Sequence, residues 1–78
     1  MINLRHAVNH ARHGDWVKAH EMAQADDSLM GYWLHGILHF YEGDLENAAH
    51  WYAKAGRNFA QRGNPTVELG RLEGELQD

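Results

Sequence analysis

One short pattern occurs twice in the sequence, as HARHGDW from His10 to Trp16 and as HFYEGDL from His39 to Leu45. In each copy a histidine is followed, four residues later, by Gly-Asp and then by an apolar residue. Glycine readily adopts the left-handed backbone conformation that ends a helix, and aspartate caps the first turn of the helix that follows. The pattern therefore predicts two tight turns, each joining two helices.

The similarity between the two copies extends well beyond the turns when the sequence is aligned with itself, His10 on His39. The matched pairs are His6 with His35, His10 with His39, Gly14 with Gly43, Asp15 with Asp44, and Ala19 with Ala48. A small residue after each turn allows two antiparallel helices to approach closely. We therefore predict an internal repeat of two helical hairpins.

Apolar residues recur at spacings of three and four and nowhere alternate over the length of a strand, which predicts one all-α domain over residues 1–78. The first hairpin is expected at about 3–26, the second at about 28–62, and a short capping helix at about 65–76. The fourth helix is expected to run from Leu45 through Phe59, with Gly63 closing it. Asn64 is expected to cap the last helix, with Pro65 in its first turn.

The second hairpin resembles a tetratricopeptide repeat between about Tyr32 and Ala55. The matching residues are Tyr32 or Trp33, Gly36, His39-Phe40, Gly43-Asp44, Ala48, Tyr52 and Ala55. His35 departs from the family pattern, which usually has leucine there, and no proline closes the repeat. The resemblance implies stacked helical hairpins that bind proteins or peptides without chemistry of their own. The segment WLHGILHFYEGDLENAAHWY is also loosely similar to small bacterial helical proteins.

The charge and composition of the chain argue against several classes of function. Eleven acidic and seven basic residues give a net charge of −4, which lacks the basic footprint of nucleic-acid binding. The chain has no cysteine, only one serine, Ser28 at an expected helix cap, and no glycine-rich phosphate loop, so we do not expect an enzyme. Without a secretory signal or a membrane-spanning run, a cytoplasmic location and no membrane partner are expected.

The expected third helix, at about 28–42, is apolar over about half its circumference. A domain this small buries only roughly 60% of its unfolded surface, and two-fold pairing commonly covers such a deficit. We therefore predict a non-enzymatic interaction module that binds a protein partner, or a second copy of itself as a homodimer. Trp33, Ile37 and Phe40 are the residues expected at that interface.

Two sets of metal-ligating residues share a helical spacing of i, i+4 and i+7. They are His6, His10 and His13 in the first copy, and His35, His39 and Glu42 in the second. Imidazole and carboxylate groups at this spacing can bind zinc or another divalent metal. A helical wheel places both sets opposite the apolar face, whereas the tetratricopeptide register places His35 and His39 against the neighbouring repeat. The alternative function is therefore a histidine-rich protein that binds a divalent metal or responds to pH.

Overall fold

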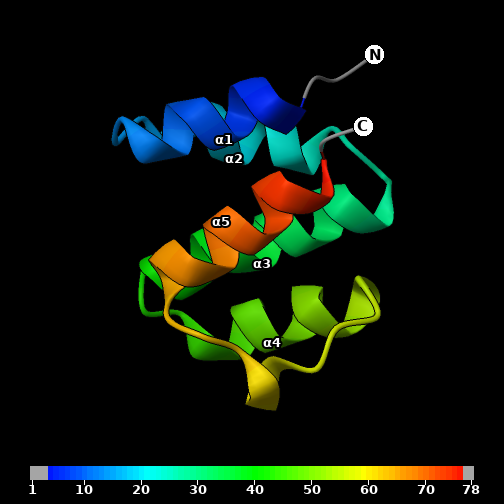
Figure 1. The fold of residues 1–78 in the computed structure, drawn as a ribbon. Helices are drawn as coiled ribbons and strands as arrows, with labels where there is room; N and C mark the ends of the chain where they lie inside the picture. The colour runs from blue at the N-terminus through cyan, green and yellow to red at the C-terminus, as the bar shows by residue number, and fades with distance from the viewer. Residues whose placement is uncertain (1–3, 77–78) are drawn as a thin grey trace.

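The two Gly-Asp turns separate four of the helices in the computed structural model, which describes residues 4–76. The elements are α1 (Leu4–Arg12), α2 (Trp16–Gln24), α3 (Leu29–Tyr41), α4 (Leu45–Lys54), the short 3₁₀ turn η1 (Phe59–Gln61) and α5 (Pro65–Glu75) (Figure 1). No strand occurs within residues 4–76, so the predicted all-helical fold is confirmed. Asn3, where the first helix was expected to begin, lies outside the described residues.

The predicted Gly-Asp turn is present in both hairpins with nearly the same backbone geometry. Gly14 and Gly43 adopt left-handed φ angles of 83° and 80°, and each ends a helix. Asp15 and Asp44 each accept a hydrogen bond, at 3.2 and 3.5 Å, from the backbone N–H three residues later. The backbone N–H of each aspartate also donates to the carbonyl oxygen five residues earlier, at 2.8 and 3.0 Å. The repeat in the sequence is therefore also a repeat in backbone structure.

The predicted fourth helix is too long, because α4 ends at Lys54 rather than continuing through Phe59. Gly56 follows with a φ of 74°, so the chain leaves the helix there and Phe59 begins η1 instead. Gly63 consequently closes no helix. The cap predicted for α5 is confirmed, since the Asn64 side chain accepts a hydrogen bond from the N–H three residues later and proline opens the helix.

Helix α3 is central, since it packs against α1, α2, α4 and α5. Figure 1 shows α5 folded back along α3, with its last turn near α1. The core combines large side chains, many of them from α3, with buried alanines of α1, α2 and α4. The largest fully buried side chains are Trp33, Tyr52, Leu34, Ile37, Leu38, Leu69, Leu72 and Val8. The longest of these helices has 13 residues, and no helix in the described part of the chain could span a bilayer.

The packing of α5 corrects the expected partner-binding face. Trp33 and Ile37 are only 1% and 0% exposed, so both belong to the core of the monomer and offer no surface to a partner. Phe40 is half-buried, with its ring 5.5 Å from that of Phe59 in η1. For Trp33 and Ile37 the expectation is wrong, because α5 packs on α3 more extensively than a short, glycine-containing helix was expected to. A partner contact at Phe40 stays a prediction.

Polar contacts with both hairpins hold α5 in place although it carries two glycines. The Tyr52 hydroxyl donates a 2.6 Å hydrogen bond to the carboxylate of Glu68, which is only 2% exposed. At the surface, Arg12 forms a 2.8 Å ion pair with Glu73. These contacts join α5 to one helix from each hairpin, so the last helix is integrated with the fold.

Candidate metal centre

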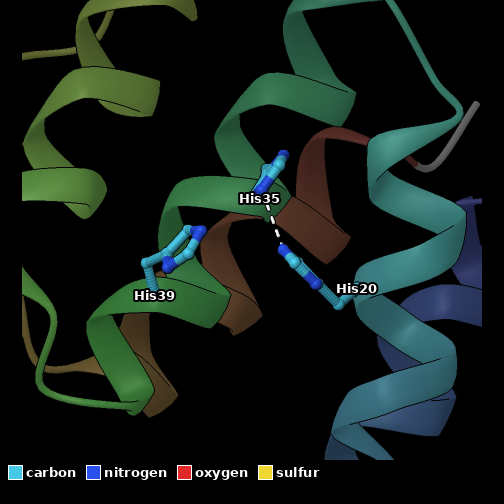
Figure 2. Close-up of side chains that lie close together, drawn as sticks. All are labelled: His20, His35 and His39. Atoms are coloured by element: carbon cyan, nitrogen blue, oxygen red, sulfur yellow. Dashed lines mark hydrogen bonds between the residues drawn. The ribbon is translucent and has the colours of Figure 1, made fainter.

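Three histidine side chains meet where the first hairpin packs against the second. His20 extends from α2 toward His35 and His39, which lie one turn apart on α3 (Figure 2). One ring nitrogen from each residue lies within 4.8 Å of the other two. The Nε2 atoms of His20 and His35 are 2.9 Å apart and share a hydrogen bond. We call these three residues the histidine cluster.

The helices bring these rings together through ordinary packing rules. His35 and His39 are four residues apart, so they project from the same face of α3. Helix α2 buries Ala19 and Ala23, and small side chains at these positions allow it to lie close to its neighbours. His20 follows Ala19 at the edge of this buried face, from which an imidazole can reach α3. The cluster therefore depends on the packing of the two hairpins.

Aromatic contacts fix the orientation of the rings in the histidine cluster. The His35 ring stacks on Trp51, with centroids 3.9 Å apart, and on His39, at 5.0 Å. The His20 ring meets both histidine rings edge-on, at 4.6 and 5.3 Å. His35 is only 4% exposed. The buried ring is thus held between two neighbours before any ligand arrives.

Burial lowers the pKa of His35 to about 4, because the protonated ring would lose hydration. Electrostatic repulsion between the protonated ring and His20, His39, Lys54 and His50 lowers it further. His35 is therefore neutral at pH 7. A neutral imidazole has a free ring-nitrogen lone pair, which is the form that binds metal ions.

A carboxylate faces the outer nitrogen of His39. The Nδ1 atom of His39 lies 3.6 Å from Oδ2 of Asp44, and it is buried without a hydrogen-bond partner. A hydrogen bond from the Asn47 side chain, at 2.6 Å, lowers the pKa of Asp44 and favours its ionised form. Carboxylates that face one ring nitrogen of a metal-binding histidine orient the other nitrogen toward the ion. Asp44 is placed for that role as well as capping α4.

The first hairpin repeats the histidine–carboxylate contact without the cluster. Nδ1 of His10 lies 3.5 Å from Oδ2 of Asp15, matching the pair in the second hairpin. His6 and His13 are exposed, and the His13 ring nitrogen lies 2.7 Å from the carbonyl oxygen of Asn9. Among the described residues the three histidines of this set form no convergent group, because their face of α1 is exposed.

The structure brings together two of the three ligands predicted in the second copy. His35 and His39 meet, but Glu42 lies outside the cluster: its side chain is 54% exposed and approaches His39 only to 4.0 Å, at Nδ1. The helical wheel, which predicted exposed rings, is wrong for His35. His20 was missed because it lies on another helix, and the spacing of residues along the chain gives no signal that relates it to His35 and His39.

The chain was compared with known protein families, with curated proteins and with solved structures. None of these comparisons found a match. The tetratricopeptide resemblance is therefore carried by the residue pattern alone, and the geometry of the histidine cluster is the main guide to function.

Proposed function

We propose that this protein binds a divalent transition-metal ion through His20, His35 and His39. The observation that carries the proposal is the convergence of three imidazole nitrogens, one per residue, within 4.8 Å of one another. Three protein nitrogens and one water form a tetrahedral shell of the kind zinc adopts in open sites. The proposal concerns binding and assigns no reaction.

The nitrogen positions fit such an ion after small movements. Zinc–nitrogen bonds of about 2.0–2.1 Å place tetrahedral ligands roughly 3.4 Å apart. The Nε2 atoms of His20 and His35, at 2.9 Å, are slightly closer together than such ligands. The three ring nitrogens of the cluster, which lie within 4.8 Å of one another, must move inward to reach this spacing. Imidazole ligands favour zinc, copper and nickel over magnesium or calcium. When the ion binds, the donor ring of the His20–His35 hydrogen bond must carry its proton on Nδ1 in place of Nε2. Because protons compete with the ion for the imidazole lone pairs, binding weakens at acidic pH.

The bound ion would connect the two hairpins, because His20 belongs to the first and the other two ligands to the second. Binding to the folded state alone stabilises that state by about 2.7 kcal/mol when the free ligand is at 100 times its dissociation constant. Metal binding would thus reinforce a small domain that has no disulfide.

Isothermal titration with Zn²⁺ tests the proposal on protein first treated with EDTA. We expect one ion per chain and at least tenfold weaker binding for His20→Gln. His6→Gln is the matched control, since His6 is exposed and occupies in the first hairpin the position of His35. Unchanged binding in His20→Gln, or equal losses in both variants, would assign any binding to surface histidines and refute the proposal.

The alternative, an interaction module, has weaker structural support. Two of its three predicted contact residues are in the core, and the large exposed apolar side chains, Val17, Leu29, Leu45 and Val67, lie on four different helices. Apolar residues scattered singly over a surface are ordinary. Binding of a protein partner, homodimer formation and a cytoplasmic location stay predictions, and sedimentation at micromolar concentration tests the homodimer.

A further inference from the structure

A second polar site lies on the other side of α3, between the end of α4, η1 and α5. It is a cavity of about 290 Å³ whose walls include Trp33, Tyr52, Arg57, Arg62, Glu68 and Arg71. Three of the five arginines in the chain therefore line one cavity. We call it the arginine pocket. None of its residues belongs to the histidine cluster.

Among residues 4–76, Glu68 is the only carboxylate in the wall of the arginine pocket, and it already has its hydrogen bonds. Glu68 Oε1 accepts from the Tyr52 hydroxyl at 2.6 Å. Its Oε2 accepts from the Gly63 backbone N–H and from Arg71 Nη1, both at 3.2 Å. With three donors on one buried carboxylate, Glu68 has little capacity to satisfy the other donors of the pocket.

Arg62 has no carboxylate within 4.0 Å among the described residues. Its guanidinium lies over the rings of Phe59 and Phe40, with centroid distances of 3.9 and 4.9 Å, and Nη1 donates to the Phe59 carbonyl oxygen at 2.9 Å. Its Nε is buried without a hydrogen-bond partner. Buried polar groups are nearly always hydrogen-bonded, so an unpaired guanidinium nitrogen beside a cavity requires an explanation.

The indole N–H of Trp33 is a second unsatisfied donor in the same wall. Trp33 is 1% exposed, and its Nε1 has no hydrogen-bond partner. The indole N–H lies beside the Tyr52 oxygen, whereas burial and the hydrogen bond to Glu68 raise the pKa of the Tyr52 phenol and keep it protonated. Arg57 stacks over the Trp33 ring at 3.8 Å and pairs with Glu75 at 2.6 Å. The unsatisfied groups of the pocket are thus donors.

We propose that the arginine pocket binds a small organic or inorganic anion through carboxylate or phosphate groups. Among the described residues, Arg57 and Arg71 of the pocket pair with Glu75 and Glu68, and the guanidinium of Arg62 has no carboxylate partner, so one positive charge is left in excess. Guanidinium groups bind carboxylates and phosphates through paired hydrogen bonds. A volume of about 290 Å³ is at the lower end for ligand pockets and admits only a small compound.

Titrations followed by ¹⁵N NMR test this proposal on wild-type protein that has been stripped of metal with EDTA and then dialysed into EDTA-free buffer, because EDTA is itself a carboxylate anion. One arm uses inorganic phosphate and pyrophosphate, a second uses succinate and citrate, and sodium chloride at matched ionic strength is the reference. We expect saturable shifts of the Arg62 Nε–H and Trp33 indole resonances in at least one arm, with the Trp16 and Trp51 indoles unmoved. The responding arm identifies the anion class.

Substitutions at two arginines provide the matched comparison. Arg62→Lys keeps the positive charge but removes Nε and the planar fork, and we expect at least tenfold weaker anion binding. Arg12→Lys changes an arginine that also contacts α5, through Glu73, but lies outside the pocket, so its binding should equal that of wild type. Shifts in wild type that only follow ionic strength, or equal weakening in the two variants, would overturn the proposal.

Discussion

His6 and His35 occupy equivalent positions in the two hairpins, yet His6 is exposed whereas His35 is 4% exposed and stacked on Trp51. The difference arises because α2 packs against α3, while the corresponding face of α1 is exposed to solvent. His6 can therefore serve as a control, within the same chain, for each property that burial gives to His35.

The metal-free protein should lose stability as pH falls from about 6.5 toward 4. Unfolded His35 has an ordinary pKa of 6.5, whereas burial lowers its folded pKa to about 4, so between these values the unfolded state binds more protons. The full effect is about 3 kcal/mol of unfolding free energy. Urea unfolding in EDTA at several pH values measures it. His35→Gln should make the free energy of unfolding less dependent on pH, whereas His6→Gln should leave that dependence unchanged. If wild type and His35→Gln depend equally on pH, burial of His35 is not the cause.

Substitutions at Asp44 should separate its two roles. Asparagine also caps helices, so Asp44→Asn should keep a thermal midpoint close to wild type. The loss of the carboxylate beside His39 should weaken Zn²⁺ binding by about 10- to 100-fold. Asp15→Asn, the equivalent change in the first hairpin, should leave Zn²⁺ binding unaltered. Tight binding in Asp44→Asn would show that His39 needs no carboxylate partner.

Removal of the buried hydroxyl of Tyr52 should destabilise the fold. Tyr52→Phe leaves Glu68 buried without its shortest hydrogen bond, which costs about 1–3 kcal/mol. Tyr41→Phe is the control, because its hydroxyl makes only an exposed 3.3 Å hydrogen bond to Thr66. Chemical denaturation measures both free energies of unfolding. If both variants change the free energy of unfolding equally and only slightly, Glu68 takes up a proton or rearranges at little cost when the Tyr52 hydroxyl is removed.

Two glycine-to-alanine substitutions should have opposite effects on stability. A Cβ atom at Gly36 would lie 2.7 Å from Cδ1 of Tyr52 and 3.1 Å from the carbonyl oxygen of Ala48, so α3 and α4 would have to separate. We expect Gly36→Ala to cost about 1–3 kcal/mol. A Cβ at Gly74 meets nothing within 4 Å, and Gly74→Ala should add up to about 1 kcal/mol of stability through helix propensity. A neutral Gly36→Ala would mean that the hairpin tolerates wider packing.

The amino-acid sequence by itself determined the helices and turns of this protein. Left-handed glycines and capping aspartates act within about five residues, so both Gly-Asp turns and the start of α5 were predictable from local signals. The single failure in helix length came at Gly56, whose left-handed conformation follows the end of a helix that was predicted to continue through Phe59. His35 and His39 could be predicted as candidate metal ligands because four-residue spacing on a helix is also a local property.

Tertiary structure alone decided which residue completes the candidate site and which apolar residues are available to partners. His20 joins His35 and His39 only because α2 packs against α3, a contact between helices for which the spacing of residues along the chain carries no signal. Trp33 and Ile37 become core residues because α5 folds back over α3 and is anchored by the buried Tyr52–Glu68 hydrogen bond. Both outcomes depend on how amphipathic helices pack in three dimensions, and helical periodicity identifies an apolar face without specifying what covers it.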